Sequence, residues 1–131
     1  MFIERLFNQD SAPVLEQVIR FTAARHRLIA ENIANVDTPG YIQKDLSPGA
    51  FQSMLAERLE RRRRCAGASL DELGQRVQNP TAGILFHDRN NRSMEQLATD
   101  LAKNAMMHNM AIELLRKQFQ QLEMALRERI V

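Results

Sequence analysis

The chain has 131 residues, 26% of them charged, a formal net charge of +2 and a single cysteine. This length suits one domain, the lone cysteine excludes an intramolecular disulfide framework, and so small a net charge does not by itself indicate a nucleic-acid-binding protein. The lack of tryptophan, a single tyrosine and only five glycines favour helices over sheets. An all-α fold is predicted.

No apolar run is long enough to cross a membrane. The first ten residues also lack the basic start and the cleavage site of a secretory signal. We therefore expect no direct membrane insertion, and we expect any export to use a route without cleavage.

The first long helix is predicted from Asp10 or Ser11 to about Asn35. Either starting residue is a suitable N-cap, and Pro13 is tolerated because its missing N–H has no partner in a first turn. Apolar residues then recur at spacings of three and four, as in an amphipathic helix. The face comprises Val14, Thr22, Ile33 and the candidate interface residues Leu15, Val18, Ile19, Leu28 and Ile29.

The segment from Asn35 to Tyr41 is the strongest stop signal in the chain. Pro39 disfavours helical geometry at Thr38, and a Pro-Gly pair supplies the fixed φ and the positive φ of a type II turn. The chain is therefore predicted to reverse or splay here.

A short extended piece, 44–47, and a helix from about Ala50 to Arg64 are predicted next. Beyond them, 65–92 is rich in breakers and polar residues and indicates a turn-rich, mobile linker with some extended structure around 84–86.

The middle helix ends in four arginines, Arg61–Arg64. Positive charge is favourable at a helix C-terminus, so a solvated helix end is the first interpretation. Contact with an acidic protein surface and contact with nucleic acid are the alternatives.

The last helix is predicted from Ser93 to about Arg129, opened by a capping box between Ser93 and Gln96. Its apolar stripe alternates steps of four and three, which is the coiled-coil rhythm. His108 lies on the stripe and is interpreted as a polar layer that fixes register, and the nearby methionines are interpreted as packing filler rather than as a binding surface. The stripe comprises Leu101, Ala105, His108, Ile112, Leu115, Phe119, Leu122 and Leu126.

Catalysis is not predicted, and neither is a cofactor or a metal. His26, His87 and His108 have no ligand spacing among themselves or with carboxylates. Cys65 has no histidine or second cysteine near it in sequence. No phosphate-binding loop or nucleophile motif occurs either.

The two stripes are expected to pair as an elongated coiled coil. Residues 1–46 and 93–131 then form one elongated domain, and 47–92 form the middle segment. Burying two such stripes barely offsets the conformational entropy of some 60 ordered residues at about 1 to 2 kcal/mol each. We therefore expect the terminal helices to order fully only in an assembly.

Two neighbouring motifs carry a family resemblance. The run 30–35 (Ala-Glu-Asn-Ile-Ala-Asn) followed by 38–41 (Thr-Pro-Gly-Tyr) closely resembles the N-terminal signature of bacterial flagellar axial proteins. Asp45-Leu46, Phe51 and Asn90-Asn91 extend the match, which is closest to the rod proteins of the basal body. Without this resemblance a generic coiled-coil adaptor is the leading alternative.

The resemblance implies a structural subunit of the periplasmic rod, with terminal segments that form a coiled-coil inner domain. Its implied partners are copies of itself, other flagellar rod and basal-body proteins and the flagellar type III export apparatus, without nucleic acid. The residues that match the family turn are Asn32, Ile33, Asn35, Thr38, Pro39, Gly40 and Tyr41.

Overall fold

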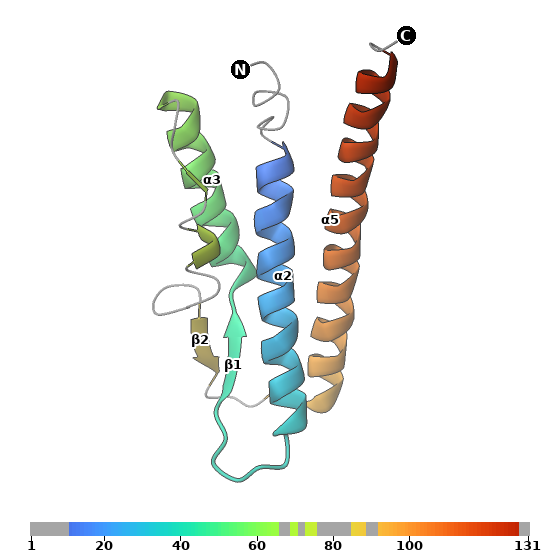
Figure 1. Cartoon of the computed structure of the whole chain (residues 1–131). Coiled ribbons are helices and arrows are strands. Elements are labelled where there is room, and N and C mark those ends of the chain that lie inside the picture. Colours follow the sequence, from blue (N-terminus) through green and yellow to red (C-terminus); the bar gives the residue numbers. More distant parts are fainter. Residues whose placement is uncertain (1–10, 66–68, 71–72, 76–84, 89–91, 129–131) are drawn as a thin grey trace.

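A computed structural model describes residues 11–65, 69–70, 73–75, 85–88 and 92–128 of the chain. Three helices lie side by side in an elongated molecule, with a two-stranded ribbon near one end (Figure 1). The predicted all-α class, with long terminal helices packed on each other, is confirmed. In chain order the elements are α2 (Ser11–Ala34), β1 (Gln43–Leu46), α3 (Pro48–Arg64), β2 (Leu85–Asp88) and α5 (Met94–Glu128).

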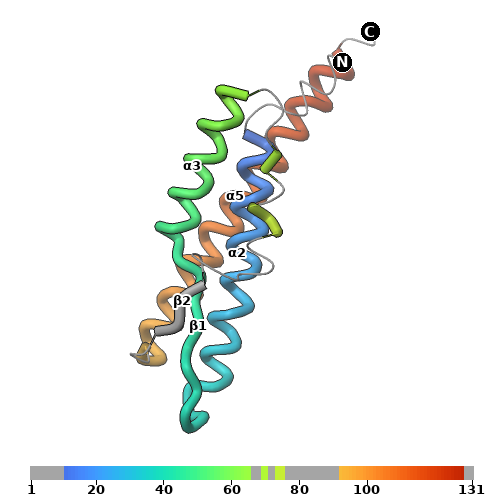
Figure 2. The backbone as a smooth tube through the Cα atoms, turned by 90° about the vertical axis from the view of Figure 1, so that its left-hand side faces the viewer, coloured from blue at the N-terminus to red at the C-terminus, as the bar shows by residue number. Residues whose placement is uncertain are grey.

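The longest element, α5, begins with the predicted capping box. The Ser93 Oγ accepts a hydrogen bond from the Gln96 N–H at 3.3 Å, and the Gln96 Oε1 accepts one from the Ser93 N–H at 3.2 Å. With 35 residues, the helix is about 50 Å long at 1.5 Å per residue. It runs antiparallel to α2, crosses it obliquely and continues past the start of α2 (Figures 1 and 2).

Helix α2 buries two different faces. Thr22 and Ile29 are fully buried, and Thr22 contacts α5 directly. On another side, Phe21 stacks on Phe51 of α3 with ring centroids 4.2 Å apart. The predicted apolar face of this helix did not include Phe21, because Phe21 lies on a different side of the helix.

The core cluster is formed by Phe21, Leu46, Phe51 and Leu73, and it joins α2, β1, α3 and the segment after α3. Val18 and Leu28, which were expected in the stripe facing the C-terminal helix, pack against this cluster. The same cluster also packs Ala24, Met54 and Leu55.

The middle segment begins as predicted, with an extended piece followed by a helix. Ser47 caps α3, because its Oγ accepts from the Ala50 N–H at 3.2 Å. β1 pairs with β2 in an antiparallel ribbon that places Gln43 opposite Asp88 and Leu46 opposite Leu85. Both strands fall close to the predicted extended pieces.

The predicted mobile linker, 65–92, is only partly described. Residues 66–68, 71–72, 76–84 and 89–91 lie outside the described residues. Within the described part Leu70 and Leu73 are buried, so these stretches pack on the molecule. Outside the masked positions, no helix is both long and apolar enough to span a bilayer.

Candidate assembly site

The predicted turn after α2 forms at Thr38–Tyr41. The Tyr41 N–H donates to the Thr38 carbonyl at 3.3 Å, and Gly40 has φ of +75°, which together define a type II turn. A Cβ atom at Gly40 would meet nothing within 4 Å. Glycine is therefore needed for its backbone conformation and not for space.

Asn35 closes the end of α2. Its Nδ2 donates to the Glu31 carbonyl at 2.8 Å, and its own carbonyl accepts from the Thr38 N–H at 3.0 Å. The Thr38 hydroxyl donates to the Asn35 Oδ1 at 3.3 Å. These bonds satisfy backbone groups that a helix end otherwise leaves unpaired, so the helix and the turn form one continuous hydrogen-bonded unit.

Asn32 fixes the chain that returns from the turn. Its Nδ2 donates to the Lys44 carbonyl at 2.6 Å, and its Oδ1 accepts from the Lys44 N–H at 3.1 Å and from the Tyr41 hydroxyl at 3.3 Å. The side-chain amide of Asn32 thus bonds both the N–H and the carbonyl of Lys44, as the backbone of a neighbouring strand does in a sheet. Because Asn32 is only 2% exposed, losing these bonds would leave polar groups shielded from water.

Tyr41 occupies a polar but partly desolvated position. Burial raises the pKa of its hydroxyl above the usual value of 10.0, and the nearby carboxylate of Glu31 adds to the increase. Both effects disfavour the phenolate, so the hydroxyl remains available as a donor to Asn32.

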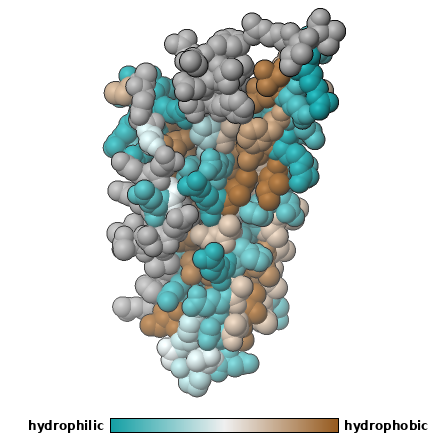
Figure 3. Space-filling view, in the orientation of Figure 1, coloured by the Kyte–Doolittle hydropathy of each residue, from teal (hydrophilic) through white to brown (hydrophobic). Residues whose placement is uncertain are grey.

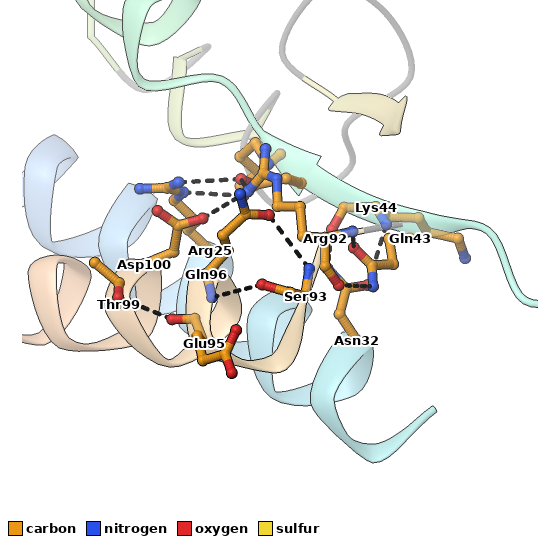
Figure 4. A network of polar contacts seen from close by, with 12 residues as sticks. Arg25, Asn32, Gln43, Lys44, Arg92, Ser93, Glu95, Gln96, Thr99 and Asp100 are labelled. Atoms are coloured by element: carbon orange, nitrogen blue, oxygen red, sulfur yellow. Dashed lines mark hydrogen bonds and ion pairs between the residues drawn. The ribbon is translucent and has the colours of Figure 1, made fainter. Parts of the chain in front are cut away.

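A second amide ties β1 to the segment that opens α5. The Gln43 Nε2 donates to the Arg92 carbonyl at 3.2 Å, and the Gln43 Oε1 accepts from the Arg92 N–H at 2.9 Å. Gln43 is 3% exposed. The start of α5 is therefore held against β1 in the same way that β1 is held against α2 (Figure 4).

Asp45 is the centre of a buried ionic network. Arg25 of α2 donates to both carboxylate oxygens, at 2.9 and 3.0 Å, and Arg92 donates to one of them at 2.8 Å. Arg92 also donates to Asp100 at 2.8 Å, and the Leu46 N–H donates to Asp45 at 2.8 Å. Two arginines and two aspartates balance in charge, and together they connect α2, β1 and α5.

Sequence reasoning did not assign Arg25, Asp45 and Arg92 to a site. Asp45 appeared only as part of the family match. The sequence did contain one indication of this network, since Asp45 stands beside the apolar Leu46 in a short predicted extended piece. A carboxylate that is buried with such a neighbour needs a cationic partner. Which arginines would reach it depends on the tertiary structure.

The seam between α2 and α5 contains polar layers. The Thr22 hydroxyl lies 2.9 and 3.0 Å from the Val18 and Ile19 carbonyls of its own helix and 2.7 Å from the His108 Nδ1, so it forms a hydrogen bond that joins the two helices. The Asn104 Nδ2 donates to the Thr22 carbonyl at 2.8 Å. Further along, the Gln118 Nε2 donates to the Ser11 hydroxyl at 2.7 Å.

The buried positions of α5 are Leu97, Asn104 and Ala111, at intervals of seven. Of the predicted stripe, Leu101, Ala105, His108, Ile112, Leu115 and Leu122 are half-buried. Phe119 and Leu126 are 48% and 46% exposed. On α2, Ile29 is buried, and Leu15, Val18, Ile19 and Leu28 are half-buried. Most of the predicted stripe is thus at least half-buried, His108 contacts α2 directly, and Phe119 and Leu126 lie at the surface.

The methionines of α5 are not packing filler. Met106 is 72% exposed and Met110 is 67% exposed, and Leu114 is exposed beside them. Other apolar residues emerge along the surface that α2 and α5 share (Figure 3). Helix α5 therefore carries more apolar surface than α2 covers, which is typical of an interaction surface.

Residues of α2 and α5 also line a cavity. A shallow cavity of about 310 Å³ is lined by Ala23, His26, Ala105, His108 and Asn109. Its two imidazoles have no carboxylate among these lining residues. Within the described ranges, no group of three or more metal-ligating side chains comes together.

No family model matches the chain. It is similar to the flagellar basal body rod protein FlgB of Salmonella typhimurium, with 28% identity over 117 residues, which span 79% of this chain and 83% of the relative. The alignment therefore extends well beyond the dozen residues of the turn signature. Over most of its length the chain resembles a flagellar basal-body rod protein, as the turn signature predicted.

Proposed function

We propose that the chain is a structural subunit of the proximal rod of the bacterial flagellar basal body. It polymerises through its terminal helices into the periplasmic shaft that transmits torque. Its partners are copies of itself and other rod and basal-body proteins. The similarity to FlgB, together with the geometry of the turn that carries the family signature, supports this proposal.

The turn supplies the fixed geometry that a helical polymer requires. Asn32 and Gln43 hold the returning strand and the start of α5 in place through paired amide bonds. Asp45 links the same elements through ion pairs with little exposure to water. With its exit angle fixed in this way, each subunit can present the same surfaces to its neighbours, and surfaces that do not close into a ring produce an open filament.

The exposed apolar side chains of α5 supply the contact area. In the assembly we expect neighbouring subunits to cover Met106, Met110, Leu114, Phe119 and Leu126. We propose that the half-buried seam residues Leu101, His108 and Leu115 maintain the helix pair that presents this surface. The isolated chain is then only marginally stable, because much of the apolar surface of α5 is exposed in it.

Export in an unfolded form through the flagellar type III apparatus is part of the proposal. The seam includes the polar layer formed by Thr22, Asn104 and His108. Polar groups at such positions fix register at a cost in stability. A seam of this kind specifies one pairing and still separates readily for export.

The decisive experiment is complementation in a bacterium that lacks its own rod gene for this position. Expression of the chain should restore motility, and the chain should co-fractionate with purified basal bodies. A variant with Leu115→Asp should fail in both assays because a charge enters the seam. A chain that forms a stable, discrete dimer and never associates with basal bodies would indicate the coiled-coil adaptor instead.

A further inference from the structure

The cavity between α2 and α5 holds two imidazoles that the proposed function does not use. His26 of α2 and His108 of α5 both line it, together with Asn109. Ala23 and Ala105 also line it, and their short side chains leave space that larger residues would fill. The two rings therefore border one shared space of about 310 Å³.

The antiparallel arrangement of the helices directs these two side chains toward each other. The contact between Thr22 and His108 places them at the same height, and His26 follows Thr22 by about one helical turn. Each side chain of an α-helix leans toward the N-terminus of its own helix. Because α2 and α5 run in opposite directions (Figure 1), His26 leans toward the height of Thr22 and His108 leans toward the height of His26.

Thr22 holds the ring of His108 from the other side. The Thr22 Oγ lies 2.7 Å from the His108 Nδ1, and it lies 2.9 and 3.0 Å from two carbonyls of its own helix. This contact occupies Nδ1, so Nε2 is the ring nitrogen that can bind another partner. A histidine that binds a metal usually has its other ring nitrogen in such a hydrogen bond, which fixes the orientation of the ring.

We propose that His26 and His108 together bind one divalent transition-metal ion across the seam between α2 and α5. His108 binds the ion through Nε2, and water and the side-chain carbonyl of Asn109 complete the coordination. In this state the His108 Nδ1 carries the ring proton and donates to the Thr22 hydroxyl, which itself donates to a carbonyl of α2. The inference goes beyond the proposed function, because it holds whether or not the chain enters a rod.

The donor set decides which ions fit. Imidazole nitrogens suit Cu²⁺, Ni²⁺ and Zn²⁺, whereas Mg²⁺ and Ca²⁺ prefer carboxylate and carbonyl oxygens. Among the described residues that line the cavity there is no carboxylate, and there is no lysine or arginine that would repel a cation. Binding should therefore be tightest for Cu²⁺, weaker for Ni²⁺ and Zn²⁺, and undetectable for Mg²⁺.

An ion in this position joins two helices that are far apart in the sequence. It lies beside the polar layer formed by Thr22, Asn104 and His108. The folded chain offers both imidazoles to one ion, whereas the unfolded chain does not hold them together. Binding should therefore stabilise the helix pair and raise the melting temperature.

The test is a titration of the full chain, free of any affinity tag, with CuCl₂, NiCl₂, ZnCl₂ and MgCl₂. Calorimetry should give one Cu²⁺ or Ni²⁺ per chain, and saturating Ni²⁺ should raise the melting temperature by about 5 °C. The electron paramagnetic resonance spectrum of the Cu²⁺ complex should show hyperfine splitting from two imidazole nitrogens. MgCl₂ should change neither the heat of mixing nor the melting temperature.

His26→Ala is the sharpest variant, because His26 is exposed and its loss should leave the fold intact. Both His26→Ala and His108→Ala should weaken binding at least about tenfold, and each should reduce the splitting to that of one nitrogen. Ala23→Leu should weaken binding comparably while keeping both imidazoles, because it fills the cavity. His87→Ala is the matched control, since His87 lies on β2, which pairs with β1, and it should bind as the wild type does.

The inference is overturned if the ions leave the melting temperature unchanged, or if His26→Ala and His108→Ala bind as tightly as the wild type. An equal loss in His87→Ala would also overturn it, because binding would then reflect histidine content alone. Sedimentation velocity provides the last check. An ion that binds only by bridging two chains would exclude a site within one helix pair.

Discussion

The turn end of the molecule and the exposed apolar face of α5 differ in how completely their groups find partners. Around the turn, Asn32, Gln43 and Asp45 are each at most 3% exposed, and each makes several hydrogen bonds within the chain. Along α5, Met106 and Met110 are more than 60% exposed. One region is completed by its own chain, whereas the other leaves large apolar side chains exposed among the described residues.

This difference suggests a division of labour. A subunit of a polymer needs a rigid element that sets geometry before contact, and the buried amides and ion pairs of the turn end supply it. It also needs adhesive surface, and flexible apolar side chains on a long helix supply that. Variants in the first region should therefore change the stability of the monomer, and variants in the second should change assembly.

The largest loss of stability is expected from Asp45→Ala. It leaves Arg25 and Arg92 with little solvent and without their shared partner, and breaking a buried ion pair in this way costs about 3–5 kcal/mol. Urea denaturation followed by circular dichroism measures the change. The control Glu113→Ala removes one end of an exposed pair with Arg116 and should cost less than about 1 kcal/mol; equal losses would contradict the importance of the network.

Asn32→Ala should cost about 2 kcal/mol, because both backbone groups of Lys44 lose a partner in a site with little access to water. The neighbouring Asn35→Ala, at the more exposed helix end, should cost about half as much. Thermal unfolding of the two variants distinguishes them. If Asn35→Ala proves the more damaging, the strand-like role of the Asn32 amide is wrong.

Gly40→Ala should cost about 1–2 kcal/mol, since a Cβ atom is disfavoured at a positive φ even where space is open. The matched change Gly49→Ala lies in the first turn of α3, where φ is not positive, and should be neutral or slightly stabilising. Chemical denaturation of both variants provides the comparison.

Tyr41 should give a small dependence of stability on alkaline pH. Its pKa is raised in the folded state, so its contribution is complete below pH 10.0, the usual tyrosine value, and is lost as pH rises through the higher folded-state value. Denaturation midpoints measured across this range should fall less steeply for Tyr41→Phe than for the wild type. Identical slopes would show that the hydroxyl is not linked to folding.

The smallest effect on stability is expected from changes to the exposed apolar side chains of α5. Met110→Glu with Leu114→Glu should change the free energy of unfolding by no more than about 0.5 kcal/mol, because both side chains are exposed in the monomer. The same variant should lose incorporation into basal bodies. A strong destabilisation of the monomer would remove the distinction between the two regions.

The sequence by itself determined the local features. The capping box of α5, the type II turn with Gly40 and the start of α3 at Ser47 each follow from a few adjacent residues. Such features depend on which backbone groups need partners and on which φ values a residue tolerates. Neighbouring residues satisfy these needs before any long-range contact forms, so they can be predicted from the chain.

The tertiary structure alone decided which face of each helix is buried. Phe21 packs on Phe51 because α2 supports two layers, while Asn104 and Ala111 enter the seam and Phe119 stays exposed. A stripe of apolar residues predicts that a face is covered, but the crossing of α2 and α5 selects the row that is covered. The partners of Asp45 were likewise chosen by long-range packing, because Arg25 and Arg92 lie 20 and 47 residues away in sequence and meet only when α2, β1 and α5 converge.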